Sequence, residues 1–105
     1  MKHLDLAKKF IVKFKKSQAE GINAVYKFQI GEEENSYFVK VNEDSCELLQ
    51  EKPEHANVTL AANEETWSSI INKNLNPQLA FMMGKLSIKG DMNLALKLPN
   101  MFDLN

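Results

Sequence analysis

The chain has 105 residues, 44% hydrophobic and 26% charged, with 13 Lys, no Arg, 14 acidic residues and a net charge of −1. These values fit one globular domain, residues 1–105, and exclude a disordered chain. They also argue against a nucleic-acid partner, because Arg makes most base and phosphate contacts. The single Cys, Cys46, excludes an internal disulfide and a Cys-based zinc site, and we expect no metal and no cofactor.

Charge is distributed unevenly along the chain. Residues 1–16 carry six Lys and one Asp, a net charge of +5. Residues 17–65 carry three Lys and eleven acids, and residues 66–105 carry four Lys and two acids, which gives −8 and +2. No apolar run approaches the ~20 residues that span a bilayer, and the N-terminus lacks the apolar run of a signal peptide. We therefore expect a cytoplasmic protein.

An amphipathic helix is predicted at the N-terminus. The apolar residues at helical spacing are Leu4, Ala7, Phe10, Ile11 and Phe14. Lys residues occupy the other face, and Gly21 can stop the helix. Such a helix either packs on a core with a solvated Lys face, which we favour, or lies on an anionic membrane. Both hold if the helix docks on a sheet and its outer face meets lipid.

Alternating apolar residues then predict four short strands, at 24–30, 37–41, 46–50 and 56–62. Glycine and acidic residues mark a turn between the first two strands, and Pro53 breaks the chain before the fourth. Short strands with tight turns between them favour an antiparallel meander.

The C-terminal third is predicted to hold three helices and a fifth strand. Asn63 is a plausible N-cap for a helix that carries Trp67 and Ile71, and Asn76-Pro77 opens another. Residues 79–83 are apolar all round, so we expect them to be buried on every side, with Gly84 ending the helix.

Residues 85–89 alternate like a strand, and Gly90-Asp91 is the cap of a last helix, 92–98, which Pro99 should stop. The resulting order is α, four β, α, α, β, α. It predicts an α/β (α+β) domain with a mixed, mainly antiparallel five-stranded sheet.

Residues that could support catalysis have simpler interpretations. Cys46 lies on the alternating face of a predicted strand with no neighbour that would lower its pKa, so we interpret it as a structural thiol. The carboxylates of Glu32, Glu33 and Glu34 fall on a predicted turn and should be solvated, whereas general acid–base pairs need a pocket. We therefore expect no catalytic residues and no enzyme activity.

Three consecutive stretches carry a family resemblance: NPQLAF at 76–81, GKLSIKGDM at 84–92 and LALKL at 94–98. Together they resemble the sterol carrier protein type 2 family. The resemblance implies a five-stranded sheet covered by helices that enclose an apolar ligand tunnel. It also implies partners among fatty acids, fatty acyl-CoA, sterols and phospholipids, bound with low selectivity.

By this resemblance, the ligand-binding residues would be Trp67, Ile71, Phe81, Met82, Met83, Leu86, Ile88, Met92, Leu96 and Met101. Met83 stands where eukaryotic relatives often have Gln, which removes a polar group. The expected function is non-catalytic binding and transfer of long apolar ligands, with transient contact between residues 1–16 and anionic membrane. The alternative is an accessory or scaffold protein that presents lipid intermediates to an enzyme complex.

Overall fold

A computed structural model describes residues 2–43 and 45–104, with side chains described from Asp5 onward. The helices are α1 (Lys2–Val12), α2 (Glu64–Ile71), α3 (Pro77–Met82) and α4 (Met92–Met101). The strands are β1 (Asn23–Ile30), β2 (Ser36–Asn42), β3 (Ser45–Leu48), β4 (Val58–Ala62) and β5 (Ser87–Gly90). Two short 3-10 helices, η1 (Lys16–Gln18) and η2 (Glu33–Asn35), lie beside β1 and β2 in sequence. The predicted order of helices and strands is confirmed.

The five strands form one sheet in the order β3-β2-β1-β4-β5. Three of the four strand pairs are antiparallel, as expected, but β4 runs parallel to β1, with Leu60 opposite Phe28. The predicted meander is therefore wrong at its fourth strand. Residues 49–57 carry the chain past β2 and β1, and the crossover buries Val58 and Leu60 to 1% exposure each in the middle of the sheet.

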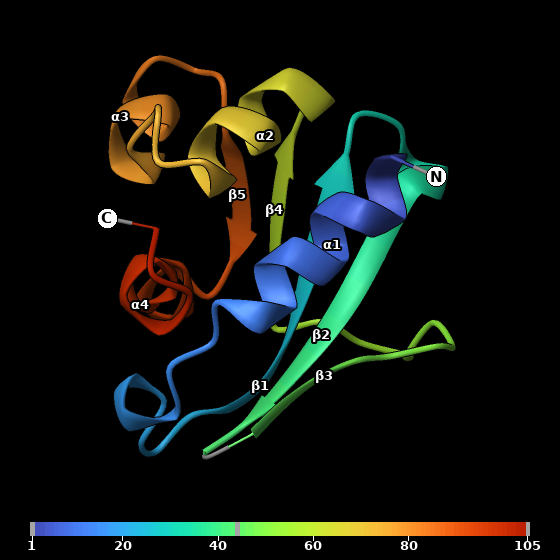
Figure 1. The fold of residues 1–105 in the computed structure, drawn as a ribbon. Coiled ribbons are helices and arrows are strands. Elements are labelled where there is room, and N and C mark those ends of the chain that lie inside the picture. Colours follow the sequence, from blue (N-terminus) through green and yellow to red (C-terminus); the bar gives the residue numbers. More distant parts are fainter. Residues whose placement is uncertain (1, 44, 105) are drawn as a thin grey trace.

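The molecule has two layers, because the helices cover one face of the sheet. Figure 1 shows α1 and α2 in front of the sheet, with α3 and α4 at the edge where β5 lies. On β1 the helix-facing side chains of Tyr26, Phe28 and Ile30 are buried, in the alternation that the sequence predicts. On the other face, Lys40 and Lys89 are exposed.

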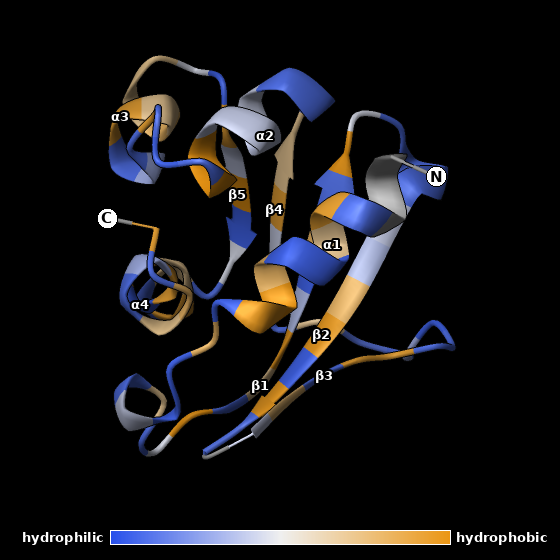
Figure 2. Cartoon of the chain, in the orientation of Figure 1, coloured by the Kyte–Doolittle hydropathy of each residue, from blue (hydrophilic) through white to orange (hydrophobic). Residues whose placement is uncertain are grey.

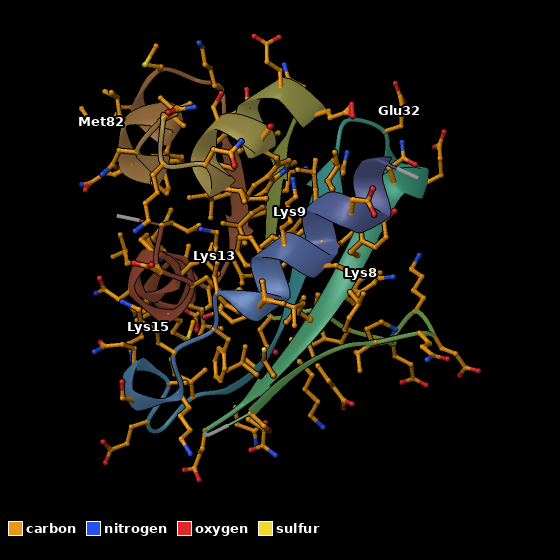
Figure 3. All side chains as sticks on the ribbon, viewed as in Figure 1. Lys8, Lys9, Lys13, Lys15, Glu32 and Met82 are labelled. Atoms are coloured by element: carbon orange, nitrogen blue, oxygen red, sulfur yellow. The ribbon has the colours of Figure 1, made fainter. Side chains whose placement is uncertain are left out.

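Helix α1 packs on the sheet, as the favoured interpretation requires. Phe10 is 3% exposed, and its ring centroid lies 4.5 Å from that of Phe28 and 4.4 Å from that of Phe102. Figure 2 shows hydrophilic and hydrophobic segments alternating along α1, and Figure 3 places Lys8 and Lys9 on it; both lysines are exposed. The side chain of Leu4, predicted on the packed face, lies outside the described residues.

Pro99 does not stop α4, contrary to the prediction. A proline in the last turn removes one N–H donor, but later contacts compensate for this loss. The N–H of Phe102 donates to the carbonyl of Leu98 at 3.1 Å, and that of Lys15 donates to the carbonyl of Met101 at 2.6 Å. Since Met101 and Phe102 are fully buried, tertiary packing holds the helix beyond its proline.

Helix α3 is not buried on every side, so that prediction is also wrong. Leu79, Phe81, Met82 and Met83 are 49%, 42%, 75% and 54% exposed. Six residues make less than two turns of helix, and Ala80 fits closely against the core, so the larger side chains point outward. In the part of the chain that the structure describes, no helix is long and apolar enough to cross a membrane.

Candidate functional site

An apolar pocket of about 350 Å³ lies between α3 and α4, beside β4 and β5. Its volume falls within the range of roughly 300–1,000 Å³ that is typical of small-molecule sites. The lining residues are Leu60, Pro77, Gln78, Phe81, Met82, Leu86, Ile88, Met92, Ala95, Leu96, Leu98 and Pro99. All are apolar except Gln78. The pocket opens to solvent at Met82 and Leu96, which are 75% and 63% exposed.

Local capping builds the α3 wall of the pocket. The side-chain oxygen of Asn76 accepts from the backbone N–H groups of Gln78 at 2.8 Å and Leu79 at 3.4 Å, and Pro77 occupies the first turn. Gly84 then turns the chain at φ +77°. The turn sends Leu86 back against the helix that has just ended, where its N–H donates to the carbonyl of Ala80 at 3.2 Å.

A second sharp turn places the α4 wall. Gly90 has φ +104°, and a Cβ there would lie 2.5 Å from the backbone oxygen of Asn57. That same oxygen accepts from the N–H of Asp91 at 3.0 Å. The Asp91 carboxylate caps α4 by accepting from the N–H groups of Asn93 and Leu94. Glycine at 90 therefore lets β5 turn into α4, which brings Met92 close to α3.

The structure gathers six of the ten expected ligand-binding residues around this pocket: Phe81, Met82, Leu86, Ile88, Met92 and Leu96. Met83 caps the end of α3, is 54% exposed and does not line the pocket. Five of the six lie in the stretches that carry the family resemblance, and Met82 lies between the first two of those stretches. Pocket residues absent from the expected set include Gln78, which lies inside the first family-like stretch, and Pro99, which directly follows the last.

Trp67, Ile71 and Met101 lie elsewhere. Trp67 and Ile71 line a separate space of about 20 Å³ beneath α1, and Met101 is fully buried. The Trp67 ring packs edge-on against Phe28 at 5.6 Å between centroids, and its Nε1 donates to the carbonyl of Gln29 at 2.9 Å. Core packing thus occupies all three side chains, and none of them lines the pocket.

Groups that might do chemistry are isolated from the pocket. Cys46 is half-buried in β3, and burial raises the pKa of its thiol. Glu33 is exposed and hydrogen-bonded to Lys27, whose ammonium lowers the pKa of the carboxyl. Among the residues described, no three His, Cys, Asp or Glu side chains gather as a metal site would require. The pocket therefore offers apolar contact and the amide of Gln78.

Comparisons with known proteins match these features. Residues 6–103 match the model of the SCP-2 sterol transfer family. The chain is 38% identical over 79 residues to hydroxysteroid dehydrogenase-like protein 2 of Danio rerio. The matched segment covers 73% of this chain and 19% of that protein. The chain is 30% identical over 97 residues to sterol carrier protein 2 of Homo sapiens. That matched segment covers 83% of this chain and 18% of the human protein.

The chain thus spans about a fifth of the length of these curated relatives. A solved structure of similar fold is that of palmitated SCP2L2 from Aedes aegypti, with a TM-score of 0.73 and 18% identity over 92% of this chain and 90% of that one. The family match covers nearly all of the sheet and helices described above. The chain belongs to the SCP-2 sterol transfer family.

Proposed function

We propose that this domain binds long-chain apolar ligands in the pocket between α3 and α4, without catalysing a reaction on them. Fatty acids and fatty acyl-CoA are the preferred ligands, with sterols and phospholipids next. The observation that carries the proposal is the pocket itself, whose lining is apolar except for Gln78. The mosquito relative, described as palmitated, supports an acyl ligand.

Burial supplies the binding free energy in this proposal. Each CH₂ group removed from water contributes about 0.8 kcal/mol, so an acyl chain has ample driving force. Apolar walls discriminate poorly between chains of similar length, so selectivity should be low. The amide of exposed Gln78 can donate a hydrogen bond to a carboxylate that stays at the pocket mouth.

Two further parts of the proposal concern where the domain works. Residues 1–16 offer an electrostatic contact with anionic membrane, since Lys8, Lys9 and Lys16 are exposed while the other face of α1 is packed. The thiol of Cys46, the sole cysteine, supports a cytoplasmic location, since a reducing compartment keeps thiols free.

A second candidate is a scaffold that presents lipid intermediates to an enzyme complex. The observation that favours it is the length of the relatives, in which the matched segment is about a fifth of a longer chain, as in the dehydrogenase-like protein of Danio rerio. The same pocket would hold the lipid in both roles. Lipid binding without measurable transfer between vesicles would favour the scaffold.

Competition with a fluorescent fatty acid tests the primary proposal. Delipidated protein should show saturable binding that unlabelled palmitate displaces. Ile88→Gln places an amide in the pocket wall and should weaken binding about tenfold, because it removes apolar contact and buries a polar group. Ile11→Gln is the matched control, since Ile11 is also half-buried but lies on α1. Non-saturable binding, or equal losses in both variants, would contradict the proposal.

A further inference from the structure

The mouth of the pocket is surrounded by exposed apolar side chains. Leu79, Met82 and Met83 follow one another at i, i+3 and i+4, so they form one stripe on the outer face of α3. Across the pocket, Met92 and Leu96 of α4 are 44% and 63% exposed. We call these five residues the α3–α4 rim.

This clustering is unusual for a free surface. In the part of the chain that the structure describes, exposed large hydrophobic side chains lie at the rim and at Phe81 inside it, with Val12 of α1 as the exception. Single exposed hydrophobic residues are ordinary, but a contiguous group marks a surface that meets a partner or a membrane. The unbranched Met side chains suit a partner without a fixed shape.

Charge around the rim is basic. Lys85 precedes β5 and Lys97 follows Leu96 on α4; both are exposed. Figure 3 labels Met82 on α3 and Lys15 beside α4. Two acids lie nearby: the Asp91 carboxylate is engaged in the cap of α4, and the Asp103 carboxylate is paired with Lys15 and Lys73.

Acidic residues lie at the opposite edge of the sheet. Glu43 and Glu47 belong to the β2–β3 hairpin, and Glu51 and Glu54 follow in the crossover to β4; all four are exposed. Since β3 and β5 are the two edges of the sheet, the molecule has an apolar, basic side and an acidic side. An anionic surface attracts the first side and repels the second.

We propose that the α3–α4 rim docks into the interface of an anionic lipid bilayer, so that the pocket opens directly onto the membrane. This rests on the proposed function, because it takes the pocket to be the lipid site. The apolar tips of Leu79, Met82 and Met83 enter the headgroup region, and Lys85 and Lys97 contact lipid phosphates. An acyl chain then moves between bilayer and pocket without crossing water. A second copy of this chain fits the rim poorly, because its lysines would face one another.

Co-sedimentation with vesicles tests the proposal. Wild-type protein should bind phosphatidylcholine–phosphatidylglycerol vesicles more tightly than pure phosphatidylcholine vesicles. Leu79→Gln should weaken binding about fivefold and Leu79→Gln with Met82→Gln about tenfold or more, because both side chains leave the interface. Leu49→Gln is the matched control: Leu49 is half-buried at the acidic edge of the sheet, outside both the rim and residues 1–16, and its loss should change binding less than about twofold.

A second readout places the rim at the membrane. A polarity-sensitive dye at Met82→Cys, in a Cys46→Ser background, should shift to the blue on mixed vesicles, whereas the dye at Leu49→Cys should not. Equal losses for Leu49→Gln and the rim variants would show that the rim is not the docking surface and would overturn the proposal. A wild-type dimer that the rim variants dissociate would identify a contact between copies and would also overturn it.

Fatty-acid binding measured without vesicles separates this proposal from the one on which it rests. Leu79 does not line the pocket, so Leu79→Gln should keep wild-type affinity for the fluorescent fatty acid while losing vesicle affinity. If wild-type protein binds vesicles through the rim but binds no fatty acid, the proposed function fails and the docking surface stands. If it binds fatty acid but not vesicles, the docking proposal fails alone.

Discussion

The hydroxyl of Tyr26 on β1 donates a hydrogen bond of 2.9 Å to the backbone carbonyl oxygen of Leu94 in α4. Tyr26 is fully buried, and burial raises the pKa of its hydroxyl well above the ordinary value, with the Asp91 carboxylate adding to the effect. The hydroxyl therefore remains a donor at any physiological pH. The bond joins the centre of the sheet to the helix that forms one wall of the pocket.

Removing this bond should loosen α4 selectively. Tyr26→Phe keeps the ring and deletes the donor, which should lower the free energy of unfolding by about 1 kcal/mol. Urea unfolding measures the global loss, and amide hydrogen exchange shows whether residues 92–98 lose protection before the rest of the chain. Uniform loss of protection across the sheet and α4 would contradict a local clamp. Tyr37→Phe, on β2 and half-buried, is the control.

Ligand should order the first half of α4 more than the second. Met92 and Leu96 are exposed at the rim, whereas Met101 and Phe102 are fully buried. The Phe102 ring packs against Phe14 at 5.5 Å and holds the end of the helix. A ligand that binds only the conformation with α4 docked stabilises that conformation by about 2.7 kcal/mol at a hundredfold excess over Kd. We expect slower exchange at 92–97 after fatty acid is added and little change at 98–102.

Two outcomes of this exchange experiment would contradict the prediction for α4. Equal protection of 92–97 with and without fatty acid would mean that α4 is a fixed wall of the pocket. Measured exchange that slows equally over the whole chain would mean global stabilisation without a mobile element.

Replacing Gly90 should destabilise the fold more than replacing Gly84. Both glycines have positive φ, which costs about 1–2 kcal/mol for an L side chain. At Gly84 an added Cβ meets nothing within 4 Å, whereas at Gly90 it would lie 2.5 Å from the Asn57 oxygen. Gly90→Ala should therefore cost at least about 1 kcal/mol more than Gly84→Ala, because the β5–α4 turn must move. Equal urea midpoints for the two variants would refute this.

Asp103 should make stability depend on pH in the acid range. Its carboxylate lies 3.1 Å from the ammonium of Lys73 and 3.4 Å from that of Lys15, and the hydrogen bond to Lys73 is the largest cause of its lowered pKa. Because the pKa of Asp103 is lower in the folded state, the carboxylate stabilises the fold at pH values above its unfolded-state pKa of about 3.9. This stability is lost as the pH falls through the lower, folded-state pKa.

Asp103→Asn checks this pH dependence. Asn also tolerates the left-handed backbone at 103, where φ is 50°, so the variant removes charge without backbone strain. Wild-type protein should be the more stable at pH 7, and the two stabilities should converge as the pH falls through the lowered pKa of Asp103. High salt should shrink the difference, because the ion pairs are partly exposed. A difference that persists in acid would show that the charge is not its cause.

Local features of this protein follow from the sequence by itself. The side chains of Asn63, Asn76 and Asp91 cap α2, α3 and α4 as predicted, because a cap requires only neighbours two or three residues away. Alternation of buried residues in β1 follows from the period of a strand. The stretch at 76–98 indicated the family, and it contains the sharp turns that build both walls of the pocket.

Tertiary structure decided the rest. The parallel pairing of β4 with β1 arises from a crossover, and a strand's own residues do not specify which side of the sheet it joins. Pro99 stays helical because distant contacts bury Met101 and Phe102. Periodicity cannot tell a buried apolar side chain from one at an open rim, so Trp67 entered the core beside α1 while Met82 became exposed. Burial depends on which elements meet in space, and that is a property of the assembled fold.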